Sequence, residues 1–334
     1  MTVCFAYDNE SMQDGAGAQA LRIIAIYSLA RHYKVGYVNH EILSIDSNPG
    51  DNLIDSESKM NFIKALNEFL NLSSYSCTAK SHTKKPLPYY RLFRFLPFFQ
   101  IWLTFRSFLA LFRSQHNLYV VQNPYFLIKH KSNIYQHFID TRPKLKNHRT
   151  KTEFNIQMHI PKAKVSSKQL SDRFLPTEWY LQILLPVIKV LREQGVAYKI
   201  TVHTDVSKPG AIWNVNDGVS EKTRNYLKEN RLLDQNNSIA LNYEDFTSTL
   251  SQLGDIQIAT GISPLVAWEM MLNADLLLIG KSTFSFVPAL MNSNGTVISP
   301  RFYPKGPDTW LTLDKPSDLT DRIASEIVAQ VSLV

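Results

Sequence analysis

The sequence has only two cysteines, Cys4 and Cys77, among its 334 residues. A disulfide framework and a zinc site built on several cysteines are therefore excluded. Low-complexity tracts are also absent and 44% of the residues are hydrophobic, which predicts a folded chain of two ordinary-sized domains. The segment MTVCFAYDNE has no basic stretch before an apolar run, so a secretory signal peptide is not expected.

Acidic residues are scarce in one part of the chain. Between Lys80 and Thr150 there are thirteen Lys and Arg residues and one acid, Asp140. That segment carries a net charge of +12, and the rest of the chain carries −5, because the total is +7. The asymmetry predicts a region that meets an anionic molecule or a membrane surface.

A long apolar run is absent from the aromatic-rich segment Pro88 to Gln115. Its longest uncharged run, Phe95 to Phe105, has eleven residues, which is too short to span a bilayer. Aromatic residues mixed with arginines favour an interfacial helix on an anionic membrane, within about residues 84–115. The alternative is a helical pair packed on the core with its arginines reaching solvent. No nucleic-acid recognition motif accompanies the basic residues, so nucleic-acid binding is disfavoured.

Hydrophobic periodicity predicts strands and helices that alternate in both halves of the chain. Such alternation is typical of an α/β fold with parallel sheets. We expect two domains, 1–150 with a basic aromatic helical insertion at about 80–115, and a doubly wound domain at 151–334. Strands are expected at 3–7, 35–38, 118–121, 155–160, 198–205, 239–241, 256–259, 276–279 and 296–299. Helices are expected at 18–33, 59–70, 177–195 (Thr177 as N-cap, Gly195 as C-cap), 221–230, 245–253, 264–273 and 317–330.

The segment DGAGAQALR, Asp14 to Arg22, lies between the first predicted strand and helix. Backbone amides at a helix start can hold an anion or a sugar. The dinucleotide fingerprint G-x-G-x-x-G would require a glycine where Ala20 stands, and the loop before Gly15 is long for that turn. A nicotinamide enzyme is therefore disfavoured.

The segment GKSTFSF, Gly280 to Phe286, follows an apolar strand. A phosphate-binding P-loop would require a glycine where Asp275 stands, so that motif is disfavoured. Ligands of parallel sheets bind outside the carboxyl ends of the strands, which predicts that the hydroxyls of this segment contact a ligand. The alternative is that the hydroxyls only cap the next helix.

Two further strands end in polar residues. His159 is followed by Lys162 and Lys164, a set of donors that suits a diphosphate, and Thr204-Asp205 ends the strand after it. Acids that could deprotonate an acceptor hydroxyl include Asp14 and Glu269, with Glu178 less favoured. Each of these acids has an alternative role as a solvated or capping residue.

In this order the motifs resemble the fucosyltransferase-like glycosyltransferases, which include α1,2- and α1,6-fucosyltransferases. The family's G-x-G-like turn is matched by Gly15 to Gln19 with Arg22, and its S/T-D strand end by Thr204-Asp205. Its R-[FY]-x-P-x-x-[WY]-[YF] loop is matched by Arg173 to Tyr180. Its M-x-x-A-D-x-x-[LI]-x-x-x-S-[ST]-F-S pattern is matched by Met271 to Ser285.

The resemblance implies an α/β fold of the GT-B type, with two Rossmann-like domains facing a cleft. It implies transfer of a sugar from a nucleotide donor, usually GDP-fucose, with inversion and without a metal or other cofactor. The basic segment would then face an anionic or membrane-anchored acceptor, so we expect a glycan or lipid-linked glycan acceptor and a cytoplasmic location, peripheral on the inner face of the membrane. The donor-binding residues would be His159, Lys162, Arg173, Asp205, Ser282, Thr283 and Ser285. The residues on the acceptor side of the cleft would be Gly15, Gly17, Gln19 and Arg22.

The chain departs from the family at the H-[IV]-R-R-G-D motif. The two arginines are replaced by Pro161 and Lys162, and the Gly-Asp pair by Ala163-Lys164. A lysine offers diphosphate a point charge where arginine offers a two-pronged fork. Two alternatives therefore stay open, a family member with another nucleotide-sugar donor and an inactive relative that binds glycans.

Overall fold

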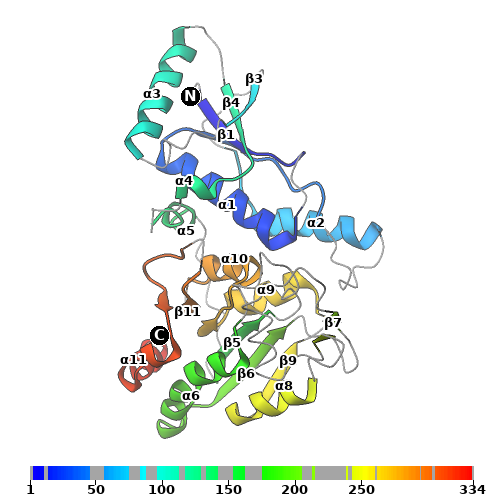
Figure 1. Ribbon diagram of the computed structural model, residues 1–334, viewed down its shortest axis with the longest axis vertical. Coiled ribbons are helices and arrows are strands. Elements are labelled where there is room, and N and C mark those ends of the chain that lie inside the picture. Colours follow the sequence, from blue (N-terminus) through cyan, green and yellow to red (C-terminus); the bar gives the residue numbers. More distant parts are fainter. Residues whose placement is uncertain are drawn as a thin grey trace. The chain divides into compact units, whose positions relative to one another are not determined.

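The computed structural model describes most of the chain. The described residues are 3–10, 14–45, 56–74, 83–87, 96–112, 117–128, 133–141, 153–161, 175–204, 213–214, 238–239, 243–259, 262–293, 295–302 and 305–332. The chain forms two compact units (Figure 1). The first contains Met1–Pro143 and Tyr303–Asp308, and the second contains Lys144–Phe302 and Thr309–Val334.

The first unit has a four-stranded sheet in the order β2-β1-β4-β3, and every neighbouring pair is parallel. Parallel pairing requires crossover connections, and helices supply them here. The strands are β1 (Val3–Tyr7), β2 (Gly36–Val38), β3 (Thr83–Pro86) and β4 (Asn117–Val121). The helices are α1 (Ala16–His32), α2 (Ser56–Leu70), α3 (Leu96–Phe112), α4 (Tyr125–Ile128) and α5 (Gln136–Ile139).

The two faces of this first sheet have different partners, because successive side chains of a strand point to opposite faces. Phe5 of β1 is in ring contact with Phe99 of α3, and Tyr7 of the same face donates a hydrogen bond to Gln19 of α1. On the other face, Cys4 and Ala6 form a small buried cluster with Leu118. Helices α1 and α3 therefore pack on the same face of the sheet.

The second unit has a six-stranded parallel sheet in the order β12-β11-β10-β5-β6-β9. Its strands are β5 (Phe154–Ile160), β6 (Tyr198–Thr204), β9 (Ile256–Ala259), β10 (Leu276–Leu278), β11 (Thr296–Pro300) and β12 (Leu311–Leu313). Its helices are α6 (Thr177–Glu193), α8 (Tyr243–Leu250), α9 (Pro264–Leu272), α10 (Thr283–Met291) and α11 (Asp321–Ser332). The 3-10 turns η3 (Ser251–Leu253) and η4 (Pro316–Asp318) lie beside α8 and α11 in the sequence.

The order of these six strands is that of a doubly wound nucleotide-binding fold. The chain runs from β5 outward to β6 and β9, returns to β10 on the other side of β5, and continues to β11 and β12. Counted along the chain, the spatial order is therefore 3-2-1-4-5-6, with a reversal between β5 and β10. This arrangement and the first sheet confirm the predicted α/β class with parallel sheets.

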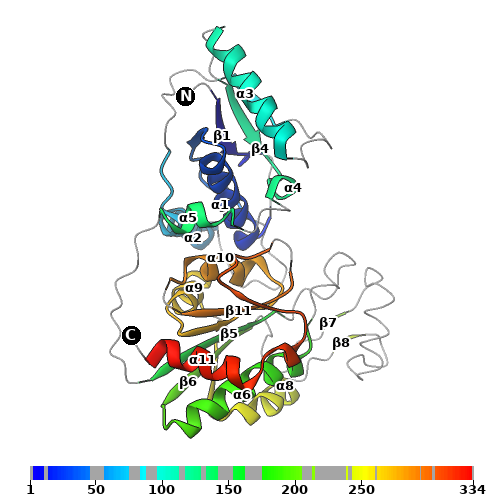
Figure 2. The same ribbon diagram turned by 90° about the vertical axis from the view of Figure 1, so that its left-hand side faces the viewer.

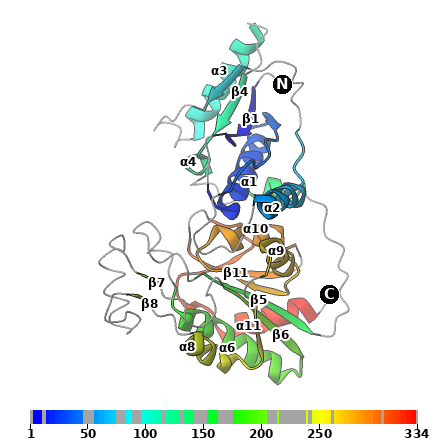
Figure 3. The same cartoon turned by 90° about the vertical axis from the view of Figure 1, so that its right-hand side faces the viewer.

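The sheet of the second unit is covered by helices on both faces (Figure 2). Helices α6, α8 and α11 lie on one face, and α9 and α10 lie on the other (Figure 3). The first face carries the main hydrophobic core, which includes Ile156 and Met158 of β5 and Ile183 and Leu184 of α6. The residues between them on β5, such as Gln157 and His159, therefore point to the face of α9 and α10.

Several predicted boundaries were wrong. Thr177 is the first helical residue of α6 and not its N-cap, because Pro176 takes the extended backbone before the helix, and the helix ends at the C-cap Gln194 before Gly195. Of the expected strand 239–241, only residue 239 is described, and it belongs to β8 (Ser238–Ile239), which pairs antiparallel with β7 (Trp213–Asn214) outside the large sheet. The expected helix 317–330 splits into η4 and α11. The expected helix 221–230 lies outside the described residues.

Within the described parts of the chain, no helix is both long enough and apolar enough to cross a membrane.

Candidate functional site

The carboxyl ends of β5 and β10 meet at the reversal point of the second unit's sheet, where open α/β sheets bind ligands. The loop after β10 packs tightly there. A methyl group on Gly280 would lie 2.5 Å from Pro161 Cδ and 2.7 Å from the hydroxyl oxygen of Tyr180. Only glycine lets the backbone of this loop come so close to Pro161 and Tyr180, so the loop packs directly against the end of β5.

Helix α10 begins at this loop, and Ser282 is its N-cap. The amide of Phe284 donates to Ser282 Oγ at 3.3 Å, and the buried Ser285 donates its hydroxyl to the Ser282 carbonyl at 3.4 Å. Ser282 therefore caps α10. The helix also contains Pro288 in its interior, so this proline does not prevent a helix from following the loop.

His159, one position before the end of β5, lies against the start of α10. Its imidazole centroid is 5.2 Å from that of Phe284, and Phe284 is in turn 5.7 Å from Trp268 of α9. Only 6% of His159 is exposed, and its Nδ1 has no hydrogen-bond partner among the described residues. The structure thus brings His159 together with the segment of Ser282, Thr283 and Ser285, as the sequence predicted for a donor site.

A second histidine lies beside the first. His203 of β6 is the direct cross-strand neighbour of His159, and 2% of it is exposed. Gln157 Nε2 donates to Asn155 Oδ1 at 2.6 Å, which leaves Gln157 Oε1 to accept from His203 Nε2 at 2.6 Å. The proton of neutral His203 is therefore on Nε2, and its Nδ1 is an acceptor that has no partner within the described part of the chain.

Both histidines are neutral at physiological pH. Burial lowers the pKa of His159 to about 3, and the neighbouring His203 contributes to the effect. Burial also lowers the pKa of His203 to about 4. A neutral imidazole can exchange hydrogen bonds with a ligand, but it supplies no positive charge to a diphosphate. Positive potential for an anionic ligand at this edge would therefore have to come from other groups, such as the amino-terminal end of α10.

The predicted acceptor-side residues of the first unit also come together. Arg22 Nη2 donates to Asp14 Oδ2 at 2.8 Å, and the amide of Gly15 donates to Asp14 Oδ1 at 2.8 Å. Gln19 Nε2 bridges the Asp14 and Ser44 carbonyls, each at 2.7 Å. Gly15 is the N-cap of α1, and Gly17 is buried in its first turn. Asp14 is thus part of a hydrogen-bonded cluster that fixes the start of α1.

One hydrogen-bond donor of this cluster, on Arg22, makes no hydrogen bond to the described residues. The side chain of Arg22 is 18% exposed, and its buried Nη1 has no hydrogen-bond partner among the residues described. Tyr7 completes the cluster by donating to Gln19 Oε1 at 3.0 Å. Burial raises the pKa of Tyr7 to about 12, so its phenol stays protonated and keeps this role as a donor.

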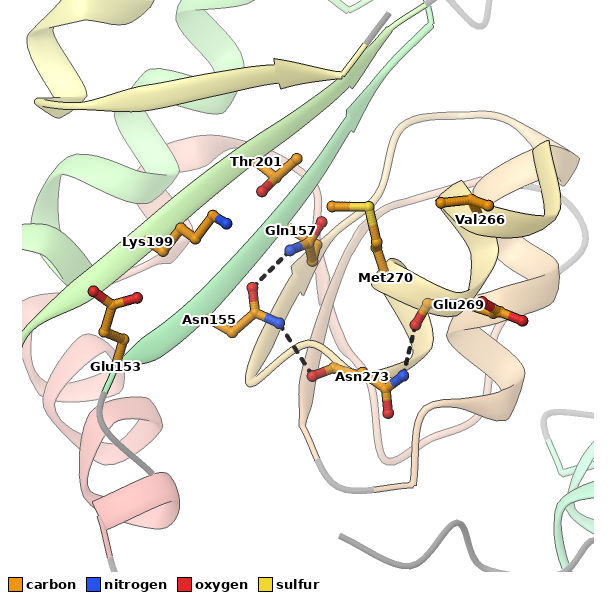
Figure 4. Close-up of a pocket in the computed structure, with 9 residues that line it drawn as sticks. All are labelled: Glu153, Asn155, Gln157, Lys199, Thr201, Val266, Glu269, Met270 and Asn273. Atoms are coloured by element: carbon orange, nitrogen blue, oxygen red, sulfur yellow. Dashed lines mark hydrogen bonds between the residues drawn. The ribbon is translucent and has the colours of Figure 1, made fainter. Parts of the chain in front are cut away.

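Glu269 lies in a different place. It lines a pocket of about 430 Å³ beneath α9, with Asn155 and Lys199 (Figure 4). The strand residues of this pocket belong to the first half of β5 and β6, away from the carboxyl edge where His159 stands. Its other lining residues are Glu153, Gln157, Thr201, Val266, Met270 and Asn273. The structure therefore places Glu269 on the same face of the sheet as His159, but nearer the amino ends of β5 and β6 than the predicted donor residues.

Three predicted donor residues, Lys162, Arg173 and Asp205, lie outside the described residues. Sequence reasoning missed His203 and Gln157 as site residues. The signal for His203 was its alternation with apolar Val202 near a strand end, which puts it on the face opposite to the core. Among the residues that the structure describes, no group of three or more His, Cys, Asp or Glu side chains is placed to hold a metal ion.

No protein-family profile and no curated protein matches this chain. Solved structures of low similarity do match it along its length. The E. coli heptosyltransferase WaaC with ADP has a TM-score of 0.39 and 10% identity, with 99% of this chain and 100% of that chain covered. The E. coli ADP-heptose lps heptosyltransferase II has a TM-score of 0.37 and 10% identity, covering 100% and 99%. The UDP-GlcNAc 2-epimerase from Methanocaldococcus jannaschii has a TM-score of 0.32 and 11% identity, covering 98% and 69%. Similarity this low assigns neither a family nor an activity.

Proposed function

We propose that this chain is a GT-B glycosyltransferase that binds a nucleotide-sugar donor at the reversal point between β5 and β10. One observation carries the proposal. The strand order 3-2-1-4-5-6 places His159 and the start of α10 at the same carboxyl edge, where folds of this kind hold nucleotides. The motifs that resemble fucosyltransferases, H-[IV] at β5 and S-[ST]-F-S at α10, end at this edge.

The chemistry of sugar transfer suits these residues. Negative charge grows on the leaving diphosphate, and the amides in the first turn of a helix stabilise such charge. Helix α10 presents that turn, while Ser282 and Ser285 use their hydroxyls to hold it in shape. The two neutral histidines beside it would accept or donate hydrogen bonds to the donor, and Lys162 would add positive charge.

The finer parts of the proposal rest on the resemblance and, for the membrane and the location, on the basic segment between Lys80 and Thr150. The donor would be GDP-fucose, transfer would invert the anomeric carbon, and no metal would be needed. The acceptor would be a glycan or a lipid-linked glycan, with an anionic membrane surface as a partner and the cytoplasmic face as the location. Asp14 is the better-supported base, because it follows β1 at the carboxyl end of the first sheet, whereas Glu269 lies away from the carboxyl edge of the second sheet.

The test is thermal unfolding of the full chain in EDTA with GDP, UDP, ADP, CMP and their sugar conjugates. A donor at a hundred times its Kd stabilises a protein by about 2.7 kcal/mol, which corresponds to a rise in Tm of several degrees. We expect GDP-fucose to give the largest rise, and isothermal titration to give one site per chain. A rise in Tm with another nucleotide sugar alone would identify a different donor, and the protein would still be a nucleotide-sugar-dependent glycosyltransferase.

Turnover separates the enzyme from an inactive relative. Release of free nucleotide from the stabilising donor, measured with a glycan acceptor, is the expected result. Binding without release would favour the alternative of a glycan-binding relative. No stabilisation by any nucleotide, together with salt-sensitive binding to RNA or DNA, would overturn the proposal.

A further inference from the structure

Helix α3 of the first unit is apolar on two opposite sides. Its inner side is buried against the sheet, where Phe99, Leu103 and Ala110 are 0%, 4% and 2% exposed. The Phe99 ring lies 4.8 Å from that of Tyr33 and 6.3 Å from that of Phe5. This side is already filled by contacts within the unit, so the helix does not depend on its outer side for packing.

Polar and aromatic contacts fix how α3 is rotated about its axis. Arg106 Nε donates to the Tyr119 hydroxyl at 2.7 Å, and the Trp102 ring lies 5.2 Å from the Tyr119 ring. Both contacts reach β4 from the inner side of the helix. The opposite side is therefore held outward, as the position of α3 beside β1 and β4 also shows (Figure 1).

The outward side carries a continuous apolar stripe. Ile101, Phe105, Phe108 and Phe112 are 63%, 57%, 55% and 75% exposed. Together with Phe98, which is 52% exposed, they follow each other at steps of three and four residues, so they lie in one row. We call these five residues the outer stripe. A row of four phenylalanines and one isoleucine in water is costly, and such patches mark interaction sites.

The charge of the sequence that flanks the stripe favours one kind of partner. No acidic residue occurs between Glu68 and Asp140, and that stretch contains nine Lys and Arg residues. Arg94 and Arg113 bracket α3 closely in the sequence. An anionic lipid surface matches both features, because its headgroups attract the arginines and its acyl boundary receives the phenylalanines. A second copy of the chain would bring like charges together.

We propose that α3 docks on an anionic membrane, lying in its plane with the outer stripe inserted at the acyl boundary. This deepens the proposed function and rests on its membrane partner, because it assigns that partner a surface of the first unit that the nucleotide site does not use. The stripe spans about 21 Å along the helix axis.

The experiment is co-sedimentation of the full chain with vesicles, without nucleotide or acceptor. One set contains phosphatidylcholine alone and the other contains phosphatidylcholine with phosphatidylglycerol. We expect binding to the anionic vesicles that is at least tenfold stronger than to the neutral ones. The variant Phe105→Glu/Phe108→Glu should reduce that binding at least tenfold.

A matched variant controls for the added charge. Leu43 and Met60 are 56% and 62% exposed and lie in the same unit outside α3. Leu43→Glu/Met60→Glu adds the same two negative charges, and we expect binding to change by less than threefold. Thermal melts confirm that both variants are folded, and Phe105→Ala/Phe108→Ala removes apolar area without charge if the glutamates unfold the helix.

Three results would overturn the proposal. One is equal weakening by the two glutamate pairs, and another is vesicle binding that neither pair changes. The third combines two observations: the wild type does not bind vesicles, and it sediments as a dimer that Phe105→Glu/Phe108→Glu converts to a monomer. That result would mean that the stripe binds a second copy of the chain. Because nucleotide is absent from this assay, its failure would leave the donor-site test unaffected.

Discussion

The imidazole of His159 lies 5.2 Å from the ring of Phe284, which joins the end of a central strand to the first turn of a helix far later in the chain. This contact packs the start of α10 against the end of β5 at the proposed donor edge. Phe284 also reaches Trp268 of α9, so one side chain links three elements.

Replacing Phe284 with leucine is therefore expected to act on binding as well as stability. We expect a loss of about 1–2 kcal/mol in the free energy of unfolding, because ring contacts and buried area are lost. Donor affinity should fall about tenfold, measured by isothermal titration. Phe154→Leu, at the buried amino end of β5, should cost similar stability and leave donor affinity unchanged. Equal loss of affinity in both variants would contradict a local role for Phe284.

The buried histidines predict a loss of stability in mild acid. Their pKa values of about 3 and 4 lie below the unfolded value of 6.5, so the unfolded chain binds more protons once the pH falls below 6.5. Above pH 6.5 these two histidines should not change the free energy of unfolding. As the pH falls from 6.5 towards 4, each should lower that free energy by about 1.4 kcal/mol per pH unit. Urea unfolding at pH 7 and at pH 5 measures this change in the free energy of unfolding. His203→Gln should make the dependence shallower, and an unchanged slope would mean that His203 does not titrate in this way.

Gly280 and Gly295 offer a matched pair of glycine substitutions. A methyl group on Gly280 would meet Pro161 and Tyr180 at the proposed donor edge, and one on Gly295 would lie 2.1 Å from the Ala274 carbonyl oxygen at the start of the sheet. Both alanine variants should lower Tm. Only Gly280→Ala should also weaken the binding of the donor, because it displaces the loop before α10. If folded Gly295→Ala weakened donor binding as much as Gly280→Ala does, the loop before α10 would have no specific role in binding the donor.

The ion pair between Asp14 and Arg22 predicts an energetic coupling that a double-mutant cycle measures. The two side chains are 41% and 18% exposed and are 2.8 Å apart. We expect Asp14→Ala and Arg22→Ala to be coupled by about 1 kcal/mol. The exposed pair Lys305 and Asp308, at 58% and 48%, is the control and should show at most about 0.5 kcal/mol. If Asp14 is the base, Asp14→Asn should abolish transfer without changing donor affinity.

The strands and helices of the core could be predicted from the sequence because their apolar residues repeat with clear periods. Val3–Tyr7 and Ile256–Ala259 were predicted at both ends. The short strand β8 was not, since its partner β7 is two residues long and pairs outside the main sheet. Local periodicity cannot show which strand pairs with which.

The candidate site was visible only in part for the same reason. His159 and the serines of α10 were predicted because they lie at or just after the ends of apolar strands, where ligands bind. The neighbouring His203 was missed as a site residue, because its pairing with His159 depends on the register of β5 and β6. Burial, which keeps both histidines neutral, also depends on helices that come later in the chain.

The short segment Tyr303–Asp308 belongs to the first unit, although the chain around it belongs to the second. Neither unit is therefore an uninterrupted stretch of sequence. A chimera that exchanges the first unit with that of another protein would need junctions on both sides of this segment as well as one after Pro143.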